Sequence, residues 1–157
     1  MDHIEEAVRR ISRIWRMHKR RESLYKLAMN MEVTAQVRKI CSVGYMSTLL
    51  FKKEIASLYE DIKCSLTDGD LNSITRSEDY DGMAEATDWT NIVRLIRTHQ
   101  ENIVTEYRTF LHAVDLEILT AAMMNDHIGK LNELTKKIDI EVPPVLQPAT
   151  VSIVAVA

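Results

Sequence analysis

Five side chains on predicted helices are of the types that bind transition metals. They are three glutamates from separate helices and an adjacent aspartate–histidine pair: Glu22, Glu54, Glu106, Asp126 and His127. Carboxylate oxygens together with imidazole nitrogens suit iron or manganese. In four-helix proteins a di-metal centre takes a glutamate from each of two helices and a Glu-x-x-His pair from each of the other two. One interpretation of the set is therefore an iron or manganese site inside a helical protein.

The spacing around the histidines argues against a complete centre of this kind. Side chains three residues apart on a helix lie on one face, so each histidine of the centre should follow a glutamate by three positions. No Glu-x-x-His occurs, because the residues three before His99, His112 and His127 are Ile96, Thr109 and Met124. Residues 34–65 also lack histidine altogether. The alternative is that these acidic side chains border the core and pair with Lys or Arg, so we expect no cofactor.

Motifs of other enzyme classes are missing from the sequence. The four glycines stand singly, and neither Gly-x-Ser-x-Gly nor Cys-x-x-Cys occurs. Cys41 lies on an apolar stripe, where cysteine usually serves as a small core residue. Cys64 follows on the same predicted helix at a rise of about 35 Å, too far for a disulfide. Two free thiols favour a reducing compartment, and we expect no catalytic residue.

The composition of the 157-residue chain is that of one globular domain, with 46% hydrophobic and 27% charged residues. A net charge of −3 gives no reason to expect a nucleic-acid partner. We interpret the basic run at residues 9–21 as a solvated helix face, with a phosphate- or nucleic-acid-binding face as the alternative. Residues 1–6 do not resemble an export signal, and no apolar run predicts a membrane span. We expect a cytoplasmic protein with no membrane partner.

The hydrophobic residues from about position 4 to 138 repeat in steps of three and four, which predicts amphipathic helices. We expect helices at residues 2–29, 34–65, 88–112 and 115–137. Thr34 is a predicted N-cap of the second helix, Thr87 or Asp88 of the third, and Asp115 of the fourth. Gly44 lies inside the second helix, where it would permit close approach of a neighbouring helix.

The connections between the helices predict two hairpins. Residues 30–32 and 113–115 form short corners, whereas residues 67–85 have loop composition and make a long crossover. Two hairpins joined by one long crossover are the arrangement of ferritin-like bundles. The two hairpins also match each other, because Tyr25 and Tyr107 each precede a corner by about one turn. The predicted fold is an all-α, ferritin-like four-helix bundle over residues 1–141.

Residues 142–157 differ from the rest of the chain. Pro143, Pro144 and Pro148 exclude a regular helix. Residues 151–157 then form an apolar tail without charge, which is an aggregation hazard if left free in water. We expect the tail of residues 142–157 to dock along its own bundle or to serve as a contact with a protein partner.

The hairpins resemble a small bacterial family of ferritin-like four-helix bundles that is known mainly as a domain of unknown function. The resemblance is carried by Tyr25 and Ala28 before the first corner, by Phe51, Glu54 and Leu58, and by residues 106–108 and 127–128 of the second half. It covers roughly residues 5–137 and excludes the tail. It implies a cytoplasmic bundle linked by association to stress, and it implies no particular reaction.

Two functions remain open at this point. The first is a non-catalytic structural or interaction protein that self-associates as a homodimer or higher oligomer. The second is an iron- or manganese-binding ferritin-like protein with a depleted site formed by the five residues named first. The missing Glu-x-x-His favours the first.

Overall fold

The computed structural model of the chain describes residues 2–64 and 88–143, and every regular element in these ranges is an α-helix. The helices are α1 (Asp2–Met29), α2 (Ala35–Lys63), α4 (Trp89–Ala113) and α5 (Ile118–Glu141). The predicted helical class is therefore confirmed. The predicted crossover at residues 67–85 and the tail beyond residue 143 lie outside the described ranges.

The helix starts agree with the predicted caps at two of three positions. The Thr34 hydroxyl accepts a hydrogen bond from the Val37 amide, and the Asp88 carboxylate accepts one from the Thr90 amide. Both bonds satisfy backbone donors that a helix start leaves free. The prediction for Asp115 is wrong, because Glu117 is the N-cap of α5 and makes no side-chain capping bond.

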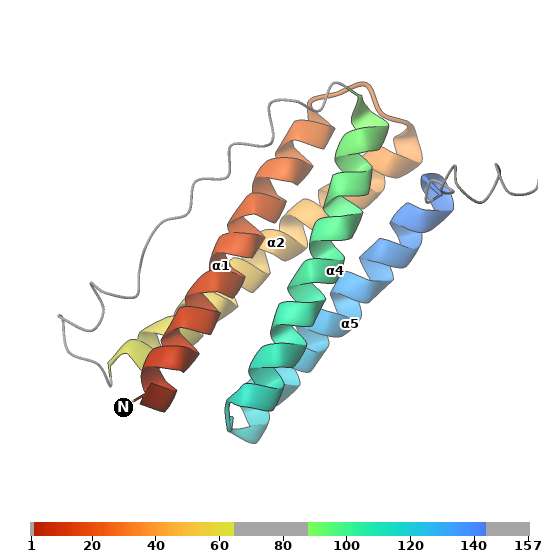
Figure 1. Ribbon diagram of the computed structural model, residues 1–157. Coiled ribbons are helices and arrows are strands. Elements are labelled where there is room, and N and C mark those ends of the chain that lie inside the picture. The colour runs from red at the N-terminus through yellow and green to blue at the C-terminus, as the bar shows by residue number, and fades with distance from the viewer. Residues whose placement is uncertain (1, 65–87, 144–157) are drawn as a thin grey trace, which may run out of the picture.

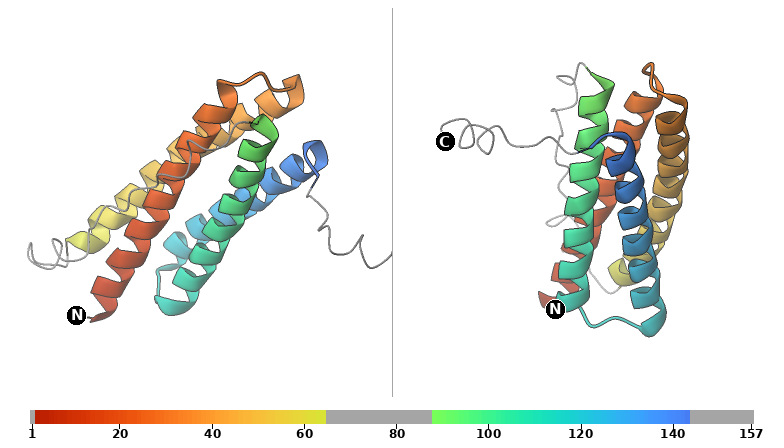
Figure 2. Two further views of the ribbon diagram at one scale, coloured as in Figure 1. Left: turned by 45° about the horizontal axis from the view of Figure 1, so that its top comes forward. Right: turned by 90° about the vertical axis from the view of Figure 1, so that its right-hand side faces the viewer.

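The four helices form two antiparallel pairs that pack face to face. Figure 1 shows α1 beside α2 and α4 beside α5, and Figure 2 shows the two pairs as separate layers. The α1–α2 corner lies at the same end as the start of α4 and the end of α5. The α4–α5 corner lies at the other end, with the start of α1 and the end of α2.

The apolar core consists of two clusters along the helix axes. The first lies toward the α4–α5 corner and includes Ile11, Ile14, Phe51, Phe110 and Leu131. The second lies toward the α1–α2 corner and includes Leu24, Ala28, Val37, Ile92 and Ile138. Burial of these side chains stabilises the fold by roughly 1.5–3 kcal/mol for each large one.

One predicted surface residue and one predicted core residue are wrongly assigned. Arg21 belongs to the basic run that we interpreted as solvated, yet its side chain is fully buried. The repeat of apolar residues in steps of three and four also places Leu119 on the core stripe of the fourth predicted helix, yet it is 81% exposed. The stripe of α5 begins later, at Met124, because the first turn of α5 extends past the end of the core.

Candidate functional site

A layer of polar side chains separates the two apolar clusters. Its fully buried members come from all four helices: His18, Arg21, Thr48, Gln100 and His127. Buried polar groups are costly unless they are hydrogen-bonded, so the partners of each one determine what the layer can do. No other part of the described core concentrates so many polar side chains, and we take this layer as the candidate site.

Tyr107 of α4 links histidines from two other helices. Its hydroxyl lies 2.8 Å from Nε2 of His18 on α1 and 2.6 Å from Nδ1 of His127 on α5. Both distances are those of good hydrogen bonds. The hydroxyl has one proton, so it donates to one ring nitrogen and accepts from the other.

Glu54 of α2 extends this chain toward the surface. Its Oε1 lies 3.4 Å from Nε2 of His127, close enough for an electrostatic contact, although this Nε2 makes no hydrogen bond to the described residues. The Glu54 side chain is 35% exposed, whereas the other three members of the chain are buried. The ring of Phe51 stacks on His127 with centroids 3.9 Å apart and holds the imidazole plane.

One assignment of protons fits these contacts. A proton on Nε2 of His127 faces the Glu54 carboxylate, which leaves Nδ1 free to accept the Tyr107 O–H. The Tyr107 oxygen then accepts the Nε2–H of His18, and Nδ1 of His18 remains a buried acceptor without a hydrogen-bond partner among the described residues. The four side chains thus form a directed relay from the partly exposed Glu54 to the interior at His18, which we call the relay.

The electrostatics of the relay favour neutral rings. Burial lowers the pKa of His18 well below its usual value, and the nearby Arg21 lowers it further. Burial also lowers the pKa of His127, although Glu54 opposes this effect. The pKa of Tyr107 is raised well above its usual value, again by burial. Both histidines are therefore neutral near pH 7, and Tyr107 keeps its proton.

Arg21 lies at the centre of a second hydrogen-bond network, on the side of the layer that faces the second apolar cluster. Its Nε donates to Oε1 of Gln100 at 2.9 Å, and its Nη2 donates to the Ser47 hydroxyl at 3.0 Å. The Tyr25 hydroxyl donates to the same Gln100 oxygen at 2.6 Å, and Gln100 Nε2 donates to Thr135 at 3.0 Å. The Nη1 group has no hydrogen-bond partner in the described residues. The guanidinium is a buried cation surrounded by neutral partners.

The predicted metal residues are mostly held apart by ion pairs. Glu22 contacts Lys52 at 2.7 Å, Glu106 contacts Arg13 at 3.0 Å, and Asp126 contacts Lys130 at 3.2 Å. Only Glu54 and His127 are brought together. Within residues 2–64 and 88–143, no group of three or more His, Cys, Asp or Glu side chains is placed to hold a metal ion.

The Arg21 network is not among the features predicted from the sequence. Polar residues on an amphipathic helix are normally assigned to the solvent face, so Arg21 was assigned with its basic neighbours. Its spacing was the available signal, because positions 18, 21 and 25 follow the three- and four-residue steps of the core stripe. Gln100 lies on the corresponding stripe of α4, between Ile96 and Ile103.

Chemically, the two hydrogen bonds of Tyr107 can move a proton between the buried rings of His127 and His18, and the carboxylate of Glu54 lies 3.4 Å from Nε2 of His127. The described contacts hold no exposed nucleophile beside the relay.

None of the described helices is long and apolar enough to cross a membrane. Comparison of the chain with known protein families, with characterised proteins and with solved structures found no match.

Proposed function

We propose that this protein is a non-catalytic, ferritin-like helical bundle that acts as a structural or interaction protein through self-association. The outer face of α2 carries the proposal. Four of the exposed large hydrophobic side chains lie within two turns of it: Val43, Met46, Leu49 and Leu50. An exposed apolar strip of this kind typically marks a protein–protein interface.

The spacing of the strip fits a second helix as its partner. Val43, Met46 and Leu50 follow steps of three and four, the pattern of a helix–helix seam. The seam continues into a groove of about 280 Å³ between α2 and α5, which is lined by Ile40, Val43, Leu134 and Ile140 among others. A helix that packs on the seam would therefore cover a continuous apolar surface.

The charges at the ends of the seam fit a second copy in antiparallel orientation. Lys39 precedes Val43 by four residues and Glu54 follows Leu50 by four, so both lie on the face of the seam. In a symmetric pair with Val43 opposite Leu50 of the other copy, Lys39 lies opposite Glu54. A two-fold interface requires such self-complementarity.

Mass measurement by light scattering over micromolar concentrations tests this proposal. We expect a mass about twice that of the 18.1 kDa chain. Met46→Glu with Leu50→Glu should shift the protein to a single-chain mass, because charges would be buried in the seam. Leu95→Glu on α4 is a matched exposed control and should leave the mass unchanged. A single-chain mass for the native protein at all concentrations would refute the proposal.

Exchange of the two charges tests the orientation. Lys39→Glu and Glu54→Lys should each weaken the dimer, whereas the double variant should restore it, because the pair is re-formed with opposite sign. If the double variant dissociates as much as the single ones, the two copies do not pair in this register.

Iron or manganese binding is a second candidate, favoured by the contact between Glu54 and His127. Two protein ligands are fewer than the three or four of most metal sites, so it ranks behind self-association. Elemental analysis of protein purified without chelator tests it. Near-stoichiometric metal that is lost in Glu54→Ala and in His127→Ala would establish it and would displace the non-catalytic proposal.

A further inference from the structure

A pocket of about 690 Å³ opens at the end of the molecule where the α4–α5 corner meets the start of α1 and the end of α2. Sites for small molecules typically measure about 300–1,000 Å³, so this pocket has a suitable size. It lies at the first apolar cluster, far along the helices from the groove between α2 and α5. Any ligand here is therefore independent of the proposed self-association.

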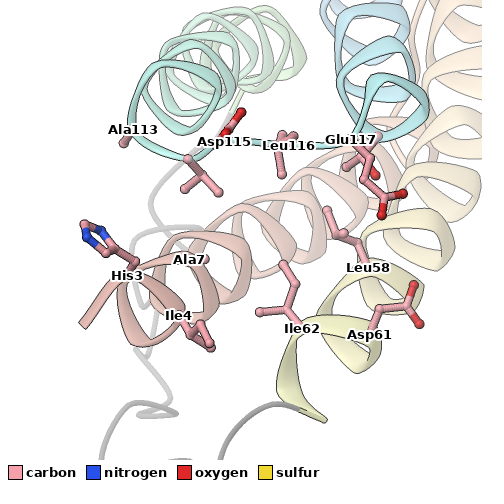
Figure 3. A pocket seen from close by; sticks show the side chains of 12 residues that line it. His3, Ile4, Ala7, Leu58, Asp61, Ile62, Ala113, Asp115, Leu116 and Glu117 are labelled. Atoms are coloured by element: carbon pink, nitrogen blue, oxygen red, sulfur yellow. The ribbon is translucent and has the colours of Figure 1, made fainter. Parts of the chain in front are cut away.

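The lining of the pocket combines an apolar floor with acidic side chains. Ile4, Leu58, Ile62 and Leu116 contribute hydrocarbon surface from α1, α2 and the corner. Figure 3 shows the carboxylates of Asp61 and Glu117 on one side of this floor, Asp115 above it and His3 on the opposite side.

The three carboxylates have no cationic partner in the described residues. Asp61, Asp115 and Glu117 form none of the ion pairs found there, although Glu22, Glu106 and Asp126 each contact a lysine or arginine. Because the pocket gathers unpaired negative charge around an apolar surface, it attracts cations and repels anions.

Helix dipoles favour two of these three carboxylates but not the third. Asp115 and Glu117 precede the start of α5, where the positive end of the helix dipole favours carboxylates. Asp61 lies in the last turn of α2, where the negative end of the dipole disfavours a carboxylate. Asp61 therefore adds to the negative potential of the pocket, although its carboxylate slightly destabilises the last turn of α2.

We propose that this pocket binds a small organic cation with an apolar body, of the alkylammonium class. The hydrocarbon chain contacts Ile4, Leu58 and Ile62, and the ammonium group lies on the side of the pocket with the carboxylates of Asp61 and Glu117, while Asp115 adds negative charge at the rim. A neutral ligand of the same shape gains only the apolar contacts, and an anion is repelled.

Three ligands of equal chain length test the proposal on the full chain: octylammonium chloride, octan-1-ol and sodium octanoate. Each is titrated into ¹⁵N-labelled protein at pH 7 and followed by amide chemical shifts. We expect saturable octylammonium shifts confined to the pocket, octanol binding at least about tenfold weaker, and no octanoate binding. Equal affinity for octanol, shifts elsewhere, or no binding of octylammonium would each overturn it.

A charge-neutral variant provides the second measurement. Asp61→Asn with Asp115→Asn and Glu117→Gln should weaken octylammonium binding at least about tenfold and leave octanol unchanged. The matched control removes three negative charges away from the pocket, at Glu32, Glu133 and Glu141, each changed to glutamine, and should bind octylammonium like the native protein. Equal losses in both variants would show that net charge, and not the pocket, determines binding. If the first variant fails to fold, the comparison of ligands on the native protein still decides.

Discussion

The ring of Tyr25 fills the space that a side chain at position 44 would need. A Cβ atom built on Gly44 would lie 2.2 Å from Cζ and 2.5 Å from the hydroxyl oxygen of Tyr25. The ring cannot move aside freely, because its hydroxyl donates to Gln100 at 2.6 Å. Gly44 thus lets α1 approach α2 closely, as its place inside a helix predicted, and it fixes one end of the Arg21 network.

Replacement of Gly44 by alanine should destabilise the protein. Alanine gains roughly 1 kcal/mol over glycine in helix propensity, but the overlap with Tyr25 should cost more, at roughly 1–3 kcal/mol or above. Gly129→Ala is the matched control, because nothing lies within 4 Å of its added Cβ. Measured by urea unfolding, the free energy of unfolding should decrease in Gly44→Ala and increase in Gly129→Ala. An increase in both variants would contradict the close packing of Tyr25 on Gly44.

Stability should decrease as the pH falls below about 6.5. Burial lowers the pKa values of His18, His99 and His127, so the unfolded chain binds protons that the folded protein does not. Each such group contributes a slope of up to about 1.4 kcal/mol per pH unit between its unfolded and folded pKa values. The free energy of unfolding, measured between pH 5 and 8, should be flat at the upper end and fall below pH 6.5.

His18→Gln separates the contribution of His18 from the others. The glutamine amide can donate to the Tyr107 hydroxyl as Nε2 of His18 does, but it does not titrate. In acid, the variant should take up about one proton fewer on unfolding, so its unfolding free energy should fall less steeply with decreasing pH. At pH 8 its stability should stay within about 1–2 kcal/mol of the native protein. An unchanged slope would show that His18 is not held neutral.

Tyr107→Phe should remove the link between the two histidines. Two buried ring nitrogens then lose their partner, at roughly 1–3 kcal/mol each, so a loss of about 2–6 kcal/mol in unfolding free energy is expected. Tyr59→Phe is the control, because the half-buried Tyr59 hydroxyl has no hydrogen bond to the described residues, and it should change stability little. Similar small effects in both variants would mean that the relay does not hold the four helices together.

Arg21→Met should be tolerated or even stabilising. A buried charge with neutral partners carries a large desolvation cost, and an apolar side chain of similar volume removes this cost, which offsets the loss of the hydrogen bonds to Gln100 and Ser47. The pKa of His18 should rise, because Arg21 is one cause of its depression. Histidine titration by NMR measures this rise. A lower pKa of His18 would contradict this electrostatic effect of Arg21. A large loss of stability would show that the hydrogen-bond partners of the guanidinium need it.

The sequence predicted the helices far better than the polar layer between them. Helix positions depend on local signals, such as the apolar period and the caps Thr34 and Asp88, which a single chain displays. The layer depends on pairings between helices. Tyr107 was noticed only because it precedes a corner, and nothing in the sequence near it indicates that His18 and His127 flank its hydroxyl. The burial of Arg21 was missed for the same reason, since its partner Gln100 lies 79 residues away.

The polar layer has a further consequence for how the helices align. Amphipathic helices with similar apolar stripes can slide past one another by a turn and still bury most of their hydrocarbon. Here a one-turn slip of α4 would move Tyr107 away from both histidines and Gln100 away from Arg21, leaving their buried polar atoms unpaired. Alternative alignments are thereby raised in energy, whereas an all-apolar interior would leave several alignments nearly equal. The layer therefore selects one register among the four helices.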